Sequence, residues 1–312
     1  MNEQPPEMQE TPLIDAMDHL ILMHRDVHFG GDFETMTEYY QKGGKGAVPD
    51  FDELRIRELS FLEQQLKQNL AALVLSGEEA ERVALAKNAY KALRSLYEGQ
   101  ANFKPIKASY PRLVADLVLS EDEEPEAEIA AIVAEQAAIV PSLITLLRSE
   151  DLHDPLFPGY GLAPRLATEC LKRIGDKRAI ISLFETIGDS DFFNEDLALD
   201  ALKAIGEPAK TFLLKPLHAR PFTYDNERAA IALSRFKDDP EVAIACFTML
   251  KQLDLKKDAV FANYLVLACE GLKGSPYQAE FIALAEASAT PSALRQDIKA
   301  IAKMWKSQNQ SL

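Results

Sequence analysis

Residues 162–187 read Leu-Ala-Pro-Arg-Leu-Ala-Thr-Glu-Cys-Leu-Lys-Arg-Ile-Gly-Asp-Lys-Arg-Ala-Ile-Ile-Ser-Leu-Phe-Glu-Thr-Ile, and this stretch decides the fold. Apolar side chains recur at helical spacing from Leu162 to Ile174 and stop at Gly175. Asp176 can cap a second helix, whose apolar stripe runs from Ala179 to Ile187. Two short amphipathic helices joined by Gly-Asp cannot bury their apolar faces alone. They therefore require neighbours of the same kind.

The chain supplies such neighbours as internal repeats. The block at residues 170–176 returns at residues 201–207, 232–238 and, weakly, 268–274, which are offsets of 31, 31 and 36 residues. Prolines mark the later helix starts, at Pro208, Pro240, Pro276 and Pro291. A side chain that can cap a helix precedes the last three of these prolines: Asp239, Ser275 and Thr290. A period of this length predicts a helical solenoid.

The motif Leu-Lys-Arg-Ile-Gly-Asp-Lys-Arg-Ala-Ile-Ile-Ser-Leu resembles the core of a HEAT-like repeat, of the subtype first named from phycobilisome lyases. The resemblance covers about residues 127–290. It is specific in the units that end at Gly175 and Gly206, and degenerate in later units, where Lys237 and Lys273 replace the glycine. The family implies an α-solenoid that usually binds another macromolecule, and it implies no single activity.

Composition favours a nearly all-α protein in the cytoplasm. The sequence contains no apolar run of about 18 residues, so no transmembrane helix is predicted. The acidic start of the chain lacks the pattern of an ordinary secretory signal. Three widely spaced cysteines (Cys170, Cys246 and Cys269) favour reduced core thiols. The net charge is −15, of which residues 1–150 carry −13 (14 basic, 27 acidic). An acidic front half argues against nucleic acid and anionic membranes as partners.

The organisation predicted from these patterns has four parts. Residues 1–11 are expected to be disordered, and residues 12–120 to form an N-terminal helical bundle or hairpin, with Thr11 as the first cap and a long helix from Asp50 to about Leu75. Residues 121–126 are an acidic run that is interpreted as a solvated linker, with a docking patch for a basic partner as the alternative. Residues 127–312 are expected to form a HEAT-like solenoid of four to five units, closed by a C-terminal capping helix that contains Trp305.

Two loops with aromatic residues interrupt the repeats and supply the candidate partner contacts. They follow residue 152 and residue 217, and inserts in solenoids often lie on the binding face. The second helices of HEAT-like pairs usually line the concave face. The predicted contact residues are Phe157, Tyr160, Arg165, Arg220, Phe222 and Tyr224. The competing interpretation is that Phe157 and Phe222 fold back and cover the core.

Histidines near the N-terminus suggest a metal or enzyme alternative. His24 and His28 are four residues apart on one helical face, a spacing that can hold a metal, and Asp32 could complete the site. Against this, the sequence between them is Arg-Asp-Val, without the glutamate of zinc proteases, and His24 continues an apolar stripe. No Glu-x-x-His recurs to build a di-iron bundle.

The predicted function is non-enzymatic binding of a protein or peptide by a scaffold or adaptor, without a cofactor. HEAT-like enzymes remain the alternative. The di-iron hydroxylases of this fold use His-Glu pairs, and no histidine here is followed by Glu. The HEAT-like glycosylases use a basic, aromatic-lined face, whereas this chain has one Trp and nearly neutral repeats. The bilin lyases share the repeats, but the repeats alone do not identify a bilin site.

Overall fold

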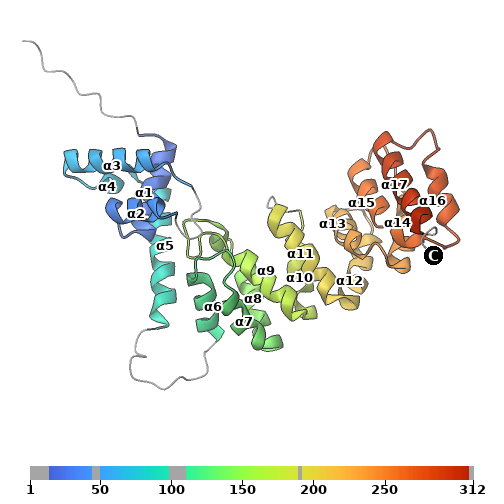
Figure 1. The fold of residues 1–312 in the computed structure, drawn as a ribbon, viewed down its shortest axis with the longest axis horizontal. Coiled ribbons are helices and arrows are strands. Elements are labelled where there is room, and N and C mark those ends of the chain that lie inside the picture. The colour runs from blue at the N-terminus through green and yellow to red at the C-terminus, as the bar shows by residue number, and fades with distance from the viewer. Residues whose placement is uncertain (1–13, 44–49, 98–109, 189–191, 309–312) are drawn as a thin grey trace, which may run out of the picture. The chain divides into compact units, whose positions relative to one another are not determined.

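A computed structural model describes residues 14–43, 50–97, 110–188 and 192–308 of the chain. These residues lie in helices, turns and loops, and no strand occurs among them, which confirms the all-α class (Figure 1). The segment expected to be disordered, residues 1–11, lies outside the described part of the chain.

The chain folds into two compact units whose boundaries differ from the predicted ones. The N-terminal unit comprises residues 1–128 and 149–164, and the C-terminal unit comprises residues 129–148 and 165–312. Residues 149–164 thus join the N-terminal helices, although they stand within the predicted solenoid. The reason is apolar burial, since Leu156 and Phe157 pack in one buried cluster with side chains of α1 (Ala16–His28) and α5 (Glu78–Ser95).

In the N-terminal unit, the first four helices each begin at a capping side chain, Asp15, Asp32, Asp52 and Asn69. After α1 come α2 (Phe33–Gln41), α3 (Glu53–Leu66), α4 (Leu70–Val74), α5, α6 (Tyr110–Leu119) and the 3-10 turn η2 (Asp151–His153), with α7 (Glu126–Ala134) crossing the boundary between units. Asp15, rather than Thr11, caps α1: its side chain accepts from the backbone N–H groups of Met17 and Asp18, and Asp18 reciprocates. The predicted capping residue was therefore wrong, and α1 starts at Ala16.

The predicted long helix from Asp50 to Leu75 is wrong, because the chain turns between α3 and α4. Lys67 adopts a left-handed conformation (φ 54°), and Asn69 then caps α4. A buried cation explains the interruption: the guanidinium of Arg25 donates to Glu63 Oε2 at 2.5 Å and to Asn69 Oδ1 at 3.1 Å. Helix α4 therefore begins beside Arg25.

The acidic run begins in the packed part of the N-terminal unit and is not simply a solvated linker. Glu121 has a φ of 51°, and its carboxylate accepts a hydrogen bond from the Tyr90 hydroxyl at 2.8 Å. Burial raises the pKa of this carboxyl. Glu123, Glu124 and Glu126 are exposed, as expected of a polar connection.

The C-terminal unit is a series of helix pairs. Its elements are η1 (Gln136–Ala138), α8 (Val140–Leu147), α9 (Ala163–Ile174), η3 (Lys177–Ala179), α10 (Ile180–Glu185), α11 (Phe192–Ile205), α12 (Glu207–Leu217), α13 (Tyr224–Leu233), η4 (Ser234–Phe236), α14 (Pro240–Leu250), α15 (Ala259–Leu267), η5 (Glu270–Leu272), α16 (Gln278–Leu284) and α17 (Ser292–Gln308). Helix α12 contacts α14, and α13 contacts α15.

The repeat signals in the sequence correspond to real helix ends. Gly175 follows α9 with a φ of 67°, and Gly206 follows α11 with a φ of 76°, as predicted for glycines that end helices in the left-handed region. Asp239 caps α14 directly before Pro240.

The core of the C-terminal unit contains the cysteines and the tryptophan. Cys170, Cys246 and Cys269 are buried thiols, and burial raises the pKa of Cys246 to about 12. Trp305 on α17 is 2% exposed, and its indole N–H donates to the carbonyl of Glu270 at 2.9 Å. Trp305 therefore lies in the core of the C-terminal unit.

Candidate functional site

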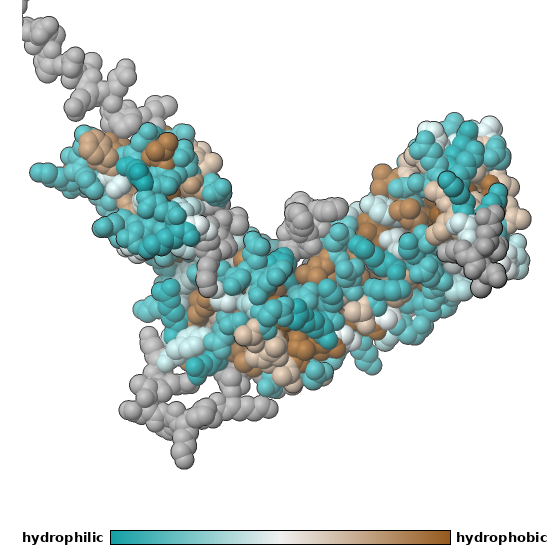
Figure 2. Space-filling view, in the orientation of Figure 1, coloured by the Kyte–Doolittle hydropathy of each residue, from teal (hydrophilic) through white to brown (hydrophobic). Residues whose placement is uncertain are grey.

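A groove on the C-terminal unit crosses α11, α13 and α15 together with η4 and η5. Its volume is about 580 Å³, within the range of about 300–1,000 Å³ that is typical of ligand sites. Figure 2 shows hydrophobic surface over these helices among hydrophilic side chains. Helices α11, α13 and α15 line it, whereas the binding face was predicted to lie on the second helices of the HEAT-like pairs, such as α12.

Helical spacing arranges the side chains at this groove in rows. On α11, Glu195, Leu199 and Lys203 line the groove at intervals of four residues. The same spacing on α13 and η4 gives Ile231 and Arg235, which line the groove, and Glu227, which lies one turn before Ile231 and outside the lining. On α15, Tyr264 lies one turn before Leu267. We call these the acidic row (Glu195, Glu227 and Tyr264), the apolar row (Leu199, Ile231 and Leu267) and the basic row (Lys203 and Arg235).

The apolar row combines a buried floor with an accessible side. Leu199 and Ile231 are 5% and 6% exposed, whereas Leu267 is 38% exposed. Val260, one turn before Tyr264 on α15, is 61% exposed. A partner side chain can therefore reach apolar surface here without rearrangement of the helices.

Both members of the basic row have contacts within the protein. Arg235 pairs with Asp196 and, at 3.7 Å, with Asp200. Lys203 places its ammonium 4.6 Å from the centre of the Phe236 ring. At the far end of the groove, Lys237 pairs with Glu270 at 2.9 Å.

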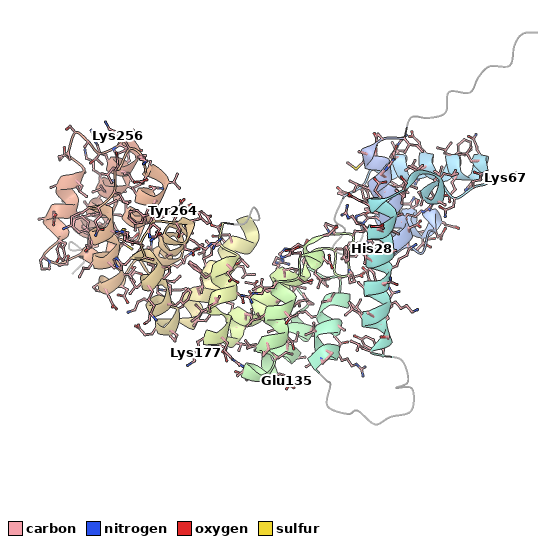
Figure 3. The ribbon with its side chains drawn as sticks, turned by 180° about the vertical axis from the view of Figure 1, so that it is seen from behind. His28, Lys67, Glu135, Lys177, Lys256 and Tyr264 are labelled. Carbon is pink, nitrogen blue, oxygen red and sulfur yellow. The ribbon has the colours of Figure 1, made fainter. Side chains whose placement is uncertain are left out.

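The acidic row has no such compensation by a described basic residue. Glu195 accepts a hydrogen bond from the backbone N–H of Gly188 at 3.0 Å. Burial, and then the charges of Glu195 and Glu227, raise the pKa of the Tyr264 hydroxyl. The two carboxylates therefore act on the same aromatic side chain, which Figure 3 labels on α15.

Arg220, Phe222 and Tyr224 form a second exposed patch on the C-terminal unit. Phe222 and Tyr224 are 46% and 47% exposed, and the Phe222 ring also packs edge-on against the buried Phe261 ring, with 6.1 Å between the ring centres. The guanidinium carbon of Arg220 lies 3.8 Å from the centre of the Phe222 ring, and Arg220 donates to Gln252 Oε1 at 2.5 Å. These three predicted contact residues are thus brought together and accessible. Arg165 is half-buried on α9.

Phe157 and Tyr160 lie elsewhere, in the core of the N-terminal unit, which corrects their assignment as surface contacts. Each is 5% exposed. Phe157 packs against α1 and α5 in an apolar cluster, and the ring of Tyr160 stacks on that of His28 at 4.2 Å. The burial of Phe157 agrees with the alternative prediction that its ring covers the core.

The proposed metal residues serve other roles in the N-terminal unit. His28, which is labelled in Figure 3, contacts the Tyr90 hydroxyl through Nδ1 (2.9 Å) and the Pro155 carbonyl through Nε2 (3.2 Å). His24 is 3% exposed and stacks on His28, and Asp32 caps α2. No group of three metal-ligating side chains occurs among the described residues.

Acidification is expected to destabilise the N-terminal unit through these histidines. Burial is the main cause that lowers the pKa of His24 to about 4 and the pKa of His28 to about 3. At His24, the negative charge of Asp154 raises the pKa and the positive charge of Arg82 lowers it. Unfolded imidazoles titrate near 6.5, so the unfolded chain binds protons that the native state excludes. Stability present above pH 6.5 is then lost as the pH falls toward 4, by up to about 1.4 kcal/mol per pH unit for each histidine.

Urea unfolding between pH 7.5 and 5 measures this slope. A His24→Phe variant is expected to show a slope about half as steep, because one of the two titrating groups is removed. An unchanged slope in the variant would contradict the assignment.

The exposed patch yields a further expectation about stability. Phe222→Ala and Tyr224→Ala should each change the free energy of unfolding by less than about 1 kcal/mol, because both rings keep nearly half of their surface in water. The matched control is Phe281→Ala on α16, where the ring is fully buried and truncation should cost about 3–5 kcal/mol. Thermal unfolding of the three variants tests this. A large loss in Tyr224→Ala would show that the patch belongs to the core.

Comparison of the chain with protein-family models, curated proteins and solved structures finds no match. Within the described residues, no helix has both the length and the apolar character needed to cross a membrane.

The sequence analysis missed the groove, although a signal for it was present. Glu195-x3-Leu199-x3-Lys203 returns 32 residues later as Glu227-x3-Ile231-x3-Arg235. This pattern lies beside the apolar stripe that defines each repeat, and so it indicates a second ordered face on the first helices. Tyr264 had no comparable signal, because its pairing with Glu195 and Glu227 depends on how the helices pack.

Proposed function

We propose that the helix pairs of the C-terminal unit are HEAT-like repeats of an α-solenoid, and that the groove over α11, α13 and α15 binds a short segment of another protein without catalysing a reaction. The observation that carries this proposal is the groove itself, which crosses α11, α13 and α15 and has an apolar floor, with Leu267 accessible, between charged rows. Such a surface suits an amphipathic segment, whose apolar side chains enter the middle row and whose polar side chains meet the edges.

Repetition supports the solenoid part of the proposal. Gly175 and Gly206 end successive first helices, α12 packs on α14, and α13 packs on α15. In a solenoid, equivalent helices line one continuous face, which is the arrangement that aligns the rows of the groove.

The charges at the groove support binding by a protein more than binding by nucleic acid. Arg235 and Lys237, which could otherwise hold phosphate groups, are paired with carboxylates. Affinity for a nucleic-acid backbone depends on basic groups that are free to neutralise phosphates. The candidate metal residues give no support to the alternative of a metal-dependent enzyme. His28 contacts the Tyr90 hydroxyl and the Pro155 carbonyl, and Asp32 caps α2.

The groove predicts where a mutation abolishes binding. Random peptides displayed on phage are selected against the full chain, and the affinities of the recovered peptides are measured by fluorescence polarisation. Leu267→Lys places a charge in the apolar row and is expected to weaken the binding of these peptides by about 5- to 150-fold, because burying an unsatisfied polar group costs about 1–3 kcal/mol.

The control is Ile181→Lys, which alters an exposed apolar residue on α10, outside the groove. It should leave peptide affinity unchanged. If Leu267→Lys binds as tightly as the parent protein, or if no peptide is recovered that depends on the groove, the proposed function is wrong. Thermal unfolding confirms that both variants remain folded.

A further inference from the structure

We propose that the acidic row is a subsite for an arginine side chain of the bound segment, held on the face of Tyr264 between Glu195 and Glu227. This inference rests on the proposed function, because it assigns the chemistry of the partner that the groove would take. It adds a direction to the site, since the basic residue of the partner must lie on one defined side of its apolar anchor.

The balance of donors and acceptors at the groove carries the argument. The basic side chains that line it already have partners: Arg235 has Asp196 and Asp200, Lys237 has Glu270, and Lys203 lies over Phe236. These groups cancel the charges of the carboxylates beside them. The partner is therefore not needed to neutralise this end of the groove.

The opposite end has acceptors in excess. Glu195 has taken one N–H, from Gly188, and a carboxylate offers about four acceptor sites. Glu227 is half-buried, and no hydrogen bond or ion pair joins its side chain to the described residues. What this end lacks is a donor.

Arginine meets that requirement better than the other side chains. Its guanidinium carries five N–H donors in one plane, stacks on aromatic faces and pairs with carboxylates through two bonds. Lysine would supply the charge but not the planar contact with the Tyr264 ring. The charges of Glu195 and Glu227, which help to raise the pKa of Tyr264, act in the same sense by favouring a cation beside the phenol.

The spacing of the rows predicts the sequence of the partner. Glu195 and Leu199 are four residues apart, which is about 6 Å along a helix at 1.5 Å per residue. Two residues of an extended peptide span about the same distance, as do neighbours three or four apart on a helix. The arginine is therefore expected two positions from the apolar anchor in an extended segment, or three to four positions from it in a helical one.

The same peptide selection, made in parallel on the full chain and on a Glu195→Gln/Glu227→Gln variant, tests the subsite. Peptides from the parent protein should be enriched in arginine at one fixed spacing from an apolar residue, and those from the variant should keep the apolar residue and lose the enrichment. Replacing the arginine of a selected peptide by citrulline should weaken binding to the parent at least about tenfold, and binding to the variant by less than about twofold.

Glu227→Gln alone provides a second readout that folding does not affect, since no described residue depends on Glu227 for a hydrogen bond. A Glu270→Gln variant is the matched control, because Glu270 lines the groove but is paired with Lys237. Two results would overturn the arginine subsite and leave the binding function intact. The first is that the selected peptides need Leu267 but are not enriched in basic residues. The second is that citrulline weakens binding to the parent protein and to the variant by the same factor. Loss of all groove-dependent peptides would instead contradict the proposed function.

Discussion

Replacing Arg25 by methionine is expected to destabilise the N-terminal unit by about 3–5 kcal/mol, the usual cost of breaking a buried ion pair from one side. The Arg25 side chain is completely buried, and its guanidinium pairs with Asp26 at 2.7 Å and Glu63 at 2.5 Å. It also lies 4.5 Å from the centre of the Phe33 ring. Methionine fills part of the volume but leaves the carboxylate of Glu63 without its cation.

The loss should be concentrated at the junction of α3 and α4. Glu63 Oε2 also accepts the backbone N–H of Leu70, and Asn69 Oδ1 accepts both Arg25 and the N–H of Ala72. Without the guanidinium, these side chains lose the charge that holds them at the start of α4. Hydrogen exchange of peptides that cover α1, α3 and α4 measures this local opening directly.

Arg57→Met is the matched control, since Arg57 pairs with Glu53 on the exposed face of α3. Exposed pairs of this kind contribute roughly 0–1 kcal/mol, so this variant should resemble the parent. If Arg25→Met is as stable as Arg57→Met, the buried cation does not organise the unit.

Truncation of Tyr160 to alanine is expected to cost about 3–5 kcal/mol, as the removal of a buried aromatic ring does. Tyr160 is 5% exposed and stacks on His28 at 4.2 Å, whereas Tyr224 is 47% exposed. Tyr160→Ala should therefore unfold at a much lower urea concentration than Tyr224→Ala. Equal stabilities of the two variants would restore Tyr160 as a surface contact.

The backbone at Tyr160 provides an internal check. Its φ of 51° lies in the left-handed region, where glycine is relaxed and alanine is not. Tyr160→Gly should thus be no less stable than Tyr160→Ala, although it removes one more carbon atom. In most helices and strands the order is reversed by about 0.5–1 kcal/mol, so unfolding midpoints of the two variants distinguish the local backbone effect from the loss of packing.

Several features of this protein followed from local sequence alone. Gly175 and Gly206 have no side chain to hinder a positive φ, and Asp239 precedes a proline that cannot extend a helix backward. These outcomes depend on the conformational preferences of one residue and its neighbours, which the sequence states directly.

The interruption between α3 and α4 and the position of residues 149–164 could not be obtained in that way. Residues 50–75 are compatible with a single helix, and the break appears because Arg25, from another helix, requires Glu63 and Asn69 as partners. Phe157 and Tyr160 look like surface aromatics in a loop, and they are buried because α1 and α5 present apolar surface to them.

The candidate site divides in the same way. Periodicity places Glu195, Leu199 and Lys203 on one face of α11, because 3.6 residues per turn brings every fourth side chain to nearly the same side. It cannot say that Tyr264, more than 60 residues later, comes under the influence of Glu195 and Glu227. The sequence determined the helices and their faces through local backbone preferences. Only the tertiary structure decided which faces meet, because that depends on burial and charge pairing between residues far apart in the chain.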